Sequence, residues 1–532
     1  AELYGAPVYA TDLQSSVRNE ATLFSLLASC ALLVFVIFRF RRWQYVLGIA
    51  VPLAAGGAMG LLALTLLFPS VHGITLAFGF TLLGVAIDYP LHIFSHPPEQ
   101  HGTTVWPTLR LGILSTLIAY AAFIASGTVG LQQLGIFATV GILCAAVTSA
   151  MLTYQQSTPL PDSDSPDTSP STTQFRFIPC LALCVAGTLG LLNEQLFSDD
   201  LSALTPVDAE ILARDNHIRT QLGTTDSRYL IAVSSAQLED NLLANERILS
   251  RLQPLMADNA LQGARSISQI LPSESVQHSR LDTLTQADAL ADFATAAETV
   301  GFTAEAFAPF LANWRRLQQN PATLTLDELT TDPQLGSAVA AMLYPASQGW
   351  RSLIFLQGLQ SKEALQDILA AEPEAELVDL KASANEMVAD YRTRLVSLLA
   401  GALLIIAVII GTRLRWRRAL WSFATVSAAV LCAAALSAWL QQGLSLFDLM
   451  ALALVGGLGL DYALFYGRDG NHTEVANTAA AVQVCAISSF MVFAVLALSS
   501  IPVLHGLGLT VSLGVVFAYG LARWGRYEKA AI

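Results

Sequence analysis

Eleven separate stretches of this sequence are apolar and long enough to cross a lipid bilayer. The hydrocarbon core of a bilayer is about 30 Å thick, so a helix needs about 20 predominantly apolar residues to span it. The stretches cover residues 21–38, 45–68, 72–94, 109–127, 132–153, 177–193, 395–412, 419–440, 444–466, 477–498 and 504–524. A helix satisfies its own backbone hydrogen bonds in lipid, so the sequence predicts a polytopic α-helical membrane protein. The composition agrees, with 54% hydrophobic and 13% charged residues.

The basic residues predict how these spans are oriented, because short loops rich in Lys and Arg stay in the cytoplasm. Three groups fall on one side of the predicted membrane: Arg39, Arg41 and Arg42; Arg413, Arg415, Arg417 and Arg418; and Arg523, Arg526 and Lys529. The short loops on the other side, 69–71, 128–131, 441–443 and 499–503, contain no Lys or Arg. The C-terminus is therefore predicted to be cytoplasmic and residues 194–393 extracytoplasmic.

Negative charge is concentrated in one segment. Residues 191–392 carry a net charge of −15 and the rest of the chain +2, which together give the net −13. The sequence thus predicts one acidic soluble domain within a nearly uncharged apolar chain. Nucleic acid is excluded as a partner, because binding phosphates needs clustered Lys and Arg. The Ser-, Pro- and Asp-rich stretch from Thr158 to Thr173 predicts a cytoplasmic linker between two halves.

Two further residue types exclude other functions. The three lysines, Lys362, Lys381 and Lys529, do not follow a glycine, so the chain has no P-loop for ATP hydrolysis. All six cysteines lie in apolar segments, where they are expected to be small core residues and not disulfides or zinc ligands. No cofactor or metal is expected.

An internal repeat is the most specific feature of the sequence. Residues 84–142 align without a gap on residues 457–515, at a constant offset of 373. The aligned pairs include Gly84 with Gly457, Asp88 with Asp461, Tyr89 with Tyr462, Ser115 with Ser488, Ser126 with Ser499, and Gly135 with Gly508. Upstream, residues 24–27 resemble 396–399. Both copies run in the same direction relative to the membrane, as in the parallel repeats of transporters.

The acidic segment contains two predicted strand–helix units. The sequence RYLIAVS at 228–234 predicts a strand, and the 20 residues after it have helical spacing. Residues 351–357 and 375–381 predict two more strands on either side of a helix. With a helical insertion near 280–345, this pattern predicts an α+β domain of the ferredoxin-like split βαβ type. Phe302, Phe307, Phe310 and Trp314 form an apolar cluster in the insertion, either as its own core or as a ligand groove.

Asp88 and Asp461 are the two carboxylates well inside the predicted spans. A charged residue at mid-membrane costs about 2.5–3.5 kcal/mol on insertion scales, and such residues mark proton or ion paths. Since burial disfavours a charged carboxylate, we expect each aspartate to take up a proton from outside and release it toward the cytoplasm. A purely structural role, bonding neighbouring helices, is the alternative. Tyr89 and Tyr462 follow directly and offer hydroxyls to the carboxylate of the opposite repeat.

Two features distinguish the first aspartate helix from the second. Pro90 cannot donate a backbone hydrogen bond, so it predicts a kink where the second copy has Ala463. His92 and His96 lie four and eight residues after Asp88, on one helical stripe toward the cytoplasmic edge. They form either a path for protons or an anchor at the helix end.

Two other patterns predict helix packing. Gly56 and Gly60 form a GxxxG pair, which is typical of close contact between membrane helices. Asp448 lies near the outer end of its span and aligns with Thr75 in the repeat. It is expected to begin a helix.

These residues resemble a known family. The motifs GVAIDYPLHIFSH at 84–96 and GLGLDYALFYG at 457–467, in matching spans of two halves, are similar to those of the MMPL family of the RND superfamily. The bacterial predicted-exporter branch is the most similar. The resemblance covers the whole chain but lacks the family's first transmembrane helix and first periplasmic domain. It implies that Asp88 pairs with Tyr462 and Asp461 with Tyr89 in a proton relay.

The resemblance also implies a domain organisation and a place in the cell. The expected segments are the tail of a missing periplasmic domain (1–20), a first transmembrane repeat of five helices (21–153), a cytoplasmic linker (154–176), a transmembrane helix (177–193), a periplasmic porter-like domain (194–393), a second repeat of five helices (394–525) and a cytoplasmic tail (526–532). Because residues 1–20 fall outside the cell without a signal peptide, we expect the native protein to begin upstream of Ala1. The expected location is the bacterial inner membrane.

The function implied is proton-driven export of lipid-like or other hydrophobic molecules. The lysine that drug-efflux members carry in the second relay helix has no counterpart here, which favours lipids over drugs as cargo. The partners expected are a lipid-like substrate, protons and membrane lipids, with a homo-oligomer or a periplasmic partner protein left open. A lipid- or sterol-sensing membrane protein that binds without transport is the alternative. An enzyme is not expected, because the sequence has no G-x-S-x-G or H-x4-D pattern.

Overall fold

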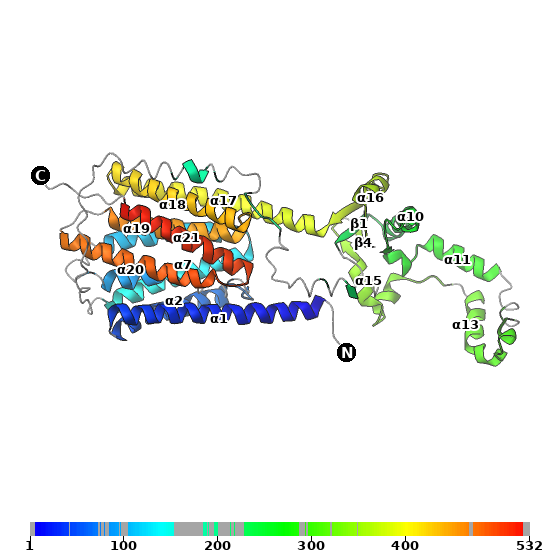
Figure 1. Ribbon diagram of the computed structural model, residues 1–532. Coiled ribbons are helices and arrows are strands. Elements are labelled where there is room, and N and C mark those ends of the chain that lie inside the picture. Colours follow the sequence, from blue (N-terminus) through cyan, green and yellow to red (C-terminus); the bar gives the residue numbers. More distant parts are fainter. Residues whose placement is uncertain are drawn as a thin grey trace. The chain divides into compact units, whose positions relative to one another are not determined.

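The computed structural model contains two compact units. It describes residues 6–41, 43–72, 84–94, 105–153, 196–200, 228–286, 296–319, 322–347, 349–467 and 472–524, with isolated residues at 75, 79, 96, 183, 185–188, 190, 213, 217–218 and 293. One unit comprises Ala1–Asp208 and Asn385–Ile532, and the other Ala209–Ala384. The first is a bundle of long helices, and the second is a smaller α+β domain (Figure 1).

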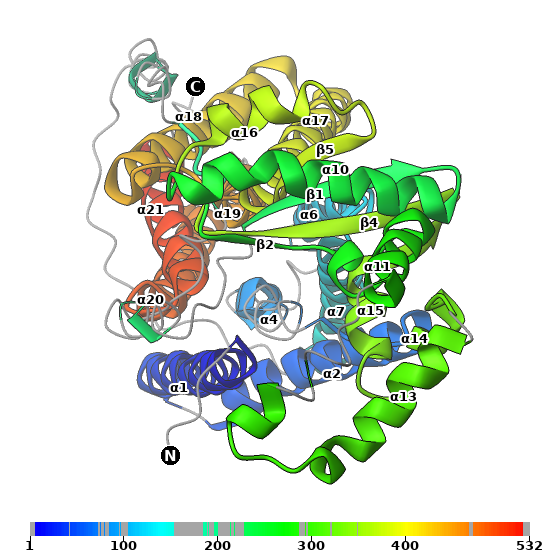
Figure 2. The ribbon, with the colours of Figure 1, turned by 90° about the vertical axis from the view of Figure 1, so that its right-hand side faces the viewer.

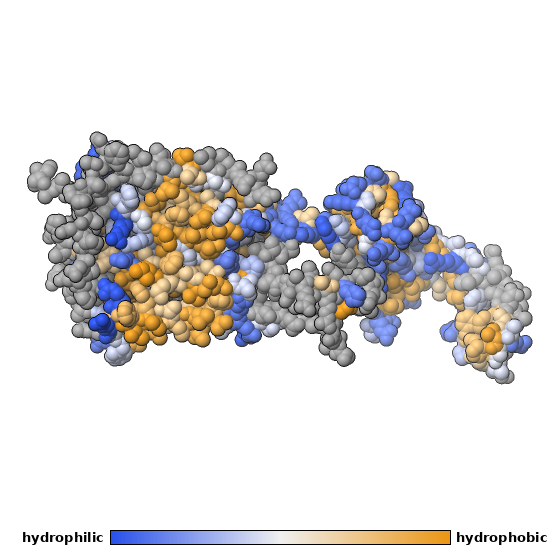
Figure 3. Space-filling model, in the orientation of Figure 1, coloured by the Kyte–Doolittle hydropathy of each residue, from blue (hydrophilic) through white to orange (hydrophobic). Residues whose placement is uncertain are grey.

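The helices of the bundle are mostly long enough to cross a membrane. They are α1 (Ala6–Phe40), α2 (Trp43–Leu67), the 3₁₀ helix η1 (Gly84–Ile87), α4 (Asp88–Phe94), α6 (Trp106–Ile124), α7 (Val129–Thr153), α17 (Leu380–Arg413), α18 (Trp416–Gln441), α19 (Leu446–Tyr466), α20 (His472–Leu496) and α21 (Pro502–Trp524). Within the described ranges, nine of them have the length and composition of a membrane span. On the face shown in Figure 3, a broad apolar band covers the middle of the bundle, with hydrophilic residues toward its ends. The predicted polytopic helical fold is confirmed.

Two of the eleven predicted spans are described only in part. Of span 177–193, the structure describes only residues 183, 185–188 and 190. Of span 72–94, the described part shows η1 followed by α4, so the expected single helix changes its geometry at Asp88. Pro90 lies in the first turn of α4, where a missing N–H is tolerated. The kink predicted from Pro90 stays a prediction.

Small residues bring α2 and α7 together, as the GxxxG pair predicts. A Cβ atom at Gly56 would lie 2.6 Å from the carbonyl oxygen of Gly141, and one at Gly60 would lie 2.8 Å from the ring of Phe137. Real Cβ atoms do not approach that closely. Glycine at both positions therefore allows the two helices to pack directly against each other.

The two aspartate-bearing helices occupy the interior of the bundle. In the apolar stretch of α19, 89% of the residues are buried, whereas only 11% are buried in that of α1. Every residue of α4 is buried as well, and α4 contacts α2, α7 and α20 (Figure 2). The outer helices thus face lipid, and the motif-bearing helices face other helices.

The second unit is an α+β domain around an antiparallel sheet. Its elements are β1 (Tyr229–Ser235), α10 (Leu238–Ala257), β2 (Gly263–Arg265), η5 (Ile267–Gln269), α11 (Glu274–Gln286), η6 (Ala304–Phe307), α13 (Ala308–Gln319), α14 (Leu326–Thr331), α15 (Gly336–Met342), β3 (Leu343–Ala346), β4 (Gly349–Gln357), α16 (Lys362–Leu369) and β5 (Ala375–Asp379). The strand order is β2-β4-β1-β5, with β3 paired to β4. The connection β1-α10-β2-β4-α16-β5 in this order is the ferredoxin-like split βαβ arrangement that the sequence predicts.

The core of this domain lies between the sheet and its helices. Ile231 and Val233 of β1 and Ile354 of β4 are fully buried against Ile248 of α10 and Leu365 of α16. The alternating burial of β4 is the period-2 pattern of a strand with one buried face.

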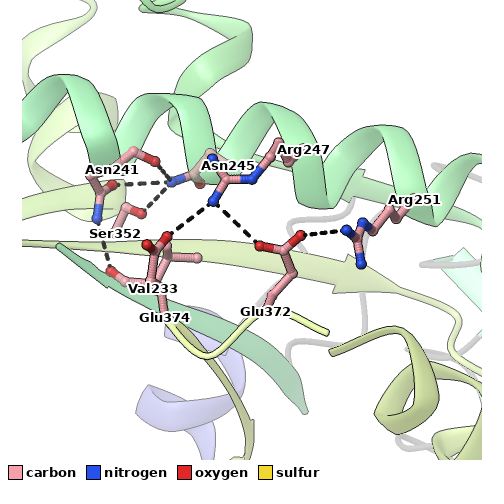
Figure 4. Close-up of polar contacts among 8 residues, drawn as sticks. All are labelled: Val233, Asn241, Asn245, Arg247, Arg251, Ser352, Glu372 and Glu374. Carbon is pink, nitrogen blue, oxygen red and sulfur yellow. Dashed lines mark hydrogen bonds and ion pairs between the residues drawn. The ribbon is translucent and has the colours of Figure 1, made fainter. Parts of the chain in front are cut away.

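A polar network crosses this core (Figure 4). The amide of Asn245 donates to Oγ of Ser352 at 2.7 Å and to the carbonyl oxygen of Asn241 at 2.7 Å. Asn241 in turn donates to the carbonyl oxygen of Val233 at 3.0 Å. Because unpaired buried polar groups are costly, the network favours one register between α10 and the sheet.

The aromatic cluster of the insertion forms as predicted and includes a fifth ring, Phe293. Phe307 lies edge-on to both Phe293 and Phe302, with ring centroids 5.1 and 5.5 Å apart, and Phe310 packs on Phe293 and Trp314. Phe302 and Phe310 remain 55% and 46% exposed. The cluster is therefore only partly shielded from solvent.

Candidate functional site

Asp461 and Tyr462 lie near the C-terminal end of α19, a helix with a well-formed start. Ser445 and Asp448 form a capping box, in which each side chain accepts a hydrogen bond from the backbone N–H of the other. The prediction that Asp448 begins a helix is confirmed. Asp448 is also buried and accepts a hydrogen bond from the Thr510 hydroxyl at 2.8 Å, which ties the helix start to α21.

Asp88 and Tyr89 open α4, directly after the 3₁₀ turn η1. Their side chains are only 2% exposed, and Tyr462 is fully buried, with Asp461 at 7%. The structure thus places all four predicted relay residues in the interior of the bundle. Both aspartates come from helices packed against the opposite repeat, because α4 contacts α20 and α19 contacts α6.

The four side chains lie within electrostatic range of one another. Asp88 lies near Tyr462 and Asp461, and Tyr89 lies near Asp461. The pairing of each aspartate with the tyrosine of the other repeat stays a prediction. Hydrogen bonds do not join them, since the Tyr89 and Tyr462 hydroxyls and both Asp88 oxygens have no hydrogen-bond partner among the described residues.

An unpartnered carboxyl in this position is energetically expensive. Burying a polar group without a hydrogen bond costs about 1–3 kcal/mol from protein mutational data, and an acid at the centre of a membrane adds to that cost. Proteins tolerate such groups mainly where they have a function. The arrangement can therefore exchange a proton between two acids that share one buried environment.

His92 and His96 follow Asp88 toward the end of α4, and both are buried. The His92 ring stacks face to face on Phe465 of α19, with centroids 3.8 Å apart and planes at 6°. Its two nitrogens have no hydrogen-bond partner within the described ranges. His96 is anchored, because its ring contacts the His92 carbonyl oxygen at 2.8 Å and the Thr478 hydroxyl of α20 at 3.0 Å.

Three residues of the site did not emerge as functional candidates from the sequence. Gly112 of α6 lies against the Asp461 carboxyl, Cys485 of α20 interacts with Asp88, and Phe465 stacks on His92. The signal that could have found them is the repeat. The offset of 373 pairs Gly112 with Cys485 and His92 with Phe465.

Metal binding finds no support in the described part of the chain, where no three His, Cys, Asp or Glu side chains gather closely enough to hold an ion. Asp88 and His92 lie on α4, His96 lies two residues after its end, and Asp461 lies on α19. Side chains of these types can take up and release protons.

No protein-family model matches the sequence, and no curated protein matches it. Solved structures do match. A heavy metal efflux pump is 10% identical with a TM-score of 0.54, and the alignment covers 97% of this chain and 67% of the pump. The hedgehog release protein Disp from the water bear Hypsibius dujardini is 11% identical with a TM-score of 0.52, covering 96% and 70%.

SecDF, a translocon-associated membrane protein from Thermus thermophilus, is 13% identical with a TM-score of 0.49, covering 95% of this chain. The chain spans 61% of the length of SecDF. Identities this low show a shared fold and leave the finer resemblance to the MMPL family as a prediction. The chain therefore shares the fold of the heavy metal efflux pump and of Disp, that of a multi-pass helical membrane protein with an α+β domain.

Proposed function

We propose that this chain belongs to a proton-driven exporter of lipid-like or other hydrophobic molecules in a bacterial inner membrane. The observation that carries the proposal is the pair of buried aspartates, Asp88 and Asp461, on neighbouring helices of two repeats. Moving one charge through 100 mV releases about 2.3 kcal/mol, which is sufficient to shift a two-state bundle by more than tenfold. The proposal includes no enzymatic step.

In this mechanism, protonation of the aspartates changes the packing of α4 and α19 against the opposite repeat. A neutral carboxyl can donate a hydrogen bond, so each protonated aspartate can bond the facing tyrosine or the other aspartate. An ionised carboxylate accepts only. Alternation between these two states, driven by the proton gradient, would move the helices that carry the acidic domain, proposed here to be periplasmic.

Lipid-like cargo is favoured by the composition of the relay. The described relay helices contain no lysine, unlike those of drug-efflux members. His92 on α4 and His96, two residues after its end, extend the proposed proton path from Asp88.

The test is proton flux in vesicles that contain the full-length protein, under an imposed pH gradient and with candidate lipids. Asp88→Asn and Asp461→Asn should each reduce lipid-stimulated flux by about a hundredfold or more, the low end for a positioned proton-transfer group. Asp448→Asn is the matched control, because Asp448 is equally buried but caps a helix. Its flux should stay close to that of the wild type.

The opposite result is equally informative. If the wild-type protein gives the flux of empty vesicles and binds lipid equally well with and without Asp88→Asn, the export proposal fails. The molecule would then be a lipid- or sterol-binding sensor in which the aspartates have a structural role.

A further inference from the structure

Residues 196–200 form a short segment that is hydrogen-bonded to the loop before α19. Phe197 pairs with Leu444 in a parallel β-bridge. The Ser198 N–H donates to the Leu444 carbonyl oxygen at 3.0 Å, and the Leu444 N–H donates to the Leu196 carbonyl oxygen at 2.9 Å. The backbone of this segment is thus fixed to the backbone of the loop.

A glycine in the loop allows this close approach. Gly443 has a φ of +140°, a backbone conformation that residues with a side chain rarely adopt. A Cβ atom there would lie 3.1 Å from Cβ and 3.2 Å from the backbone nitrogen of Ser198. Any larger residue would therefore press against the segment.

The same segment is bound to α17 through one arginine. The Arg392 guanidinium forms an ion pair of 2.5 Å with Asp199 and lies 4.5 Å from the centre of the Phe197 ring. The side chains of Arg392 and Asp199 are only 20% and 26% exposed, so salt screens this pair less than a pair at an open surface. Arg392 thus binds the segment through its charge and through the face of an aromatic ring.

These two elements are the connections between the two units of the chain. The segment precedes the α+β unit, which begins at Ala209, and α17 continues from the end of that unit at Ala384. In the apolar stretch of α17 only 22% of the residues are buried, so packing holds this helix less firmly than it holds α19. The ion pair therefore ties both connections together at one place in the helical unit.

The loop leads directly into the helix that carries Asp461. Leu444 is buried and is followed by Ser445, the N-cap of α19. The helix then continues without a break to Tyr466, and Asp461 lies about 24 Å along it from the cap at 1.5 Å per residue. Because a continuous helix moves as one body, a displacement of its first turn reaches Asp461.

We propose that the Asp199–Arg392 ion pair and the bridge to Leu444 couple the α+β domain to the relay helix α19. When the domain changes position on binding cargo, its two connections move together and shift the start of α19. Asp199 and Arg392 are then positioning residues that act on Asp461 through the helix. This inference rests on the proposed proton-driven export and adds how cargo reaches the relay, and its hydrogen-exchange test does not require transport.

Reversal of either charge should uncouple lipid from proton flux. The test uses the full-length protein in phosphatidylcholine vesicles, with phosphatidylethanolamine added as the lipid probe. Asp199→Arg and Arg392→Asp should each reduce the stimulation by lipid about fivefold or more, the low end of coupling between two sites. Flux without the probe should stay near the wild-type value, because Asp88 and Asp461 remain in place. The double variant restores the pair with its charges exchanged and should regain most of the stimulation.

Glu374→Arg is the matched control, because it breaks an ion pair of 3.2 Å with Arg247 inside the α+β domain (Figure 4). It should keep the full stimulation. Equal loss of flux with and without the probe, or a double variant that regains no stimulation, would overturn the role of the Asp199–Arg392 pair.

Hydrogen exchange in the full-length protein tests the same coupling without cargo. Asp461→Asn imitates the protonated aspartate and, since coupling between two sites is reciprocal, should change the exchange rates of the Ser198 N–H and of the α17 amides at 385–391. With Arg392→Asp added, the change at Ser198 should remain and the change in α17 should disappear. Asp199→Arg added to both should restore it.

Wild-type exchange at both places in Asp461→Asn would overturn the proposal, and so would a change in α17 that persists with Arg392→Asp. If the wild-type protein gives no lipid-stimulated flux, the proposed function fails. The exchange rates then still decide whether movement of α19 reaches the two connections of the α+β domain.

Discussion

At the scale of single residues, the surroundings of a carboxyl decide what it can do. Asp379 ends β5 and receives two hydrogen bonds from the Arg228 guanidinium, each of 3.2 Å. The backbone N–H groups of Lys381 and Ala382 also donate to it, at 3.1 Å. Hydrogen bonding from Arg228 is the main cause that lowers the pKa of Asp379 below its usual value. Asp379 thus caps α17 as an ionised group, whereas Asp88 has no such donors.

Asp379→Asn should destabilise the start of α17 by about 0.2–1 kcal/mol at neutral pH, because asparagine caps a helix as well as aspartate does but lacks the charge that pairs with the partly exposed Arg228 guanidinium. Because the folded-state pKa is lowered, the stabilisation is complete above the unfolded value of about 3.9 and is lost as the pH falls through the folded-state pKa. Hydrogen exchange of the amides at 379–383 measures the effect. The difference between variant and wild type should vanish in acid.

Arg228→Gln is the companion variant, since it removes the main donor and keeps the carboxylate. It should reproduce part of the loss at neutral pH and also lose its effect in acid. An effect of Asp379→Asn that persists unchanged in acid would show that the ionised carboxylate does not stabilise the helix start.

The sequence could predict which acids lie inside the bundle but not their contacts. Asp88 and Asp461 emerge because acids inside apolar spans are rare and the repeat aligns them. Gly112 does not emerge, because its contact with Asp461 depends on which face of α6 meets α19. That choice is made by side-chain packing across the bundle, and the hydropathy of a single span does not record it.

At the scale of elements, α1 and α17 are the longest helices of the described structure, with 35 and 34 residues. At 1.5 Å per residue each is about 50 Å long, well beyond the roughly 30 Å of a bilayer core. Glu20 of α1 accepts hydrogen bonds from the Ser499 and Ser500 hydroxyls and from the Ser500 backbone N–H. A helix of the first repeat is thereby attached to the loop that follows α20 in the second.

Glu20→Ala should release this loop, because the Ser500 N–H loses its acceptor. We expect faster hydrogen exchange at Ser500, measured on a peptide that covers residues 497–503, with little change in α7. Glu20→Gln is the control, since its side-chain oxygen can still accept one of the bonds and should give an intermediate rate. Unchanged exchange in Glu20→Ala would mean that the loop is held by its own backbone.

Both helices extend well beyond the membrane spans that the sequence predicts within them. The sequence placed spans at 21–38 and 395–412, whereas α1 begins at Ala6 and α17 at Leu380. Polar residues in the outer turns end the hydropathy signal although the helix continues. The strands β2 and β3, of three and four residues, were missed for a different reason, since a strand so short shows no periodicity.

At the scale of the whole molecule, helices of each repeat pack against helices of the other. Helix α1 packs on α20, α4 also packs on α20, and α6 packs on α19. Each half therefore completes its core with helices of the other. The sequence showed that two copies exist, but the exchange of packing partners follows only from the three-dimensional arrangement.

Cutting the chain between Thr158 and Thr173, in the linker that the sequence predicts, should therefore leave the two halves bound to each other. We expect the two fragments, when produced together, to co-purify and to retain lipid-stimulated proton flux. Each fragment produced alone is the control and should be unstable in detergent, since it exposes the faces that α4, α6, α19 and α20 normally bury. Two fragments that purify separately and remain folded would contradict this interlocked arrangement.

The stack of His92 on Phe465 has a consequence for how the two halves could diverge. These positions are equivalent in the repeat, so if the halves descend from one duplicated unit, the same residue once stood on both sides of the contact. A substitution before duplication changed both faces together, and a histidine would have met a second histidine of equal charge. Only after duplication could one position keep a titratable histidine ring while the equivalent position became an uncharged phenylalanine. At this contact, the duplication itself made the two roles separable.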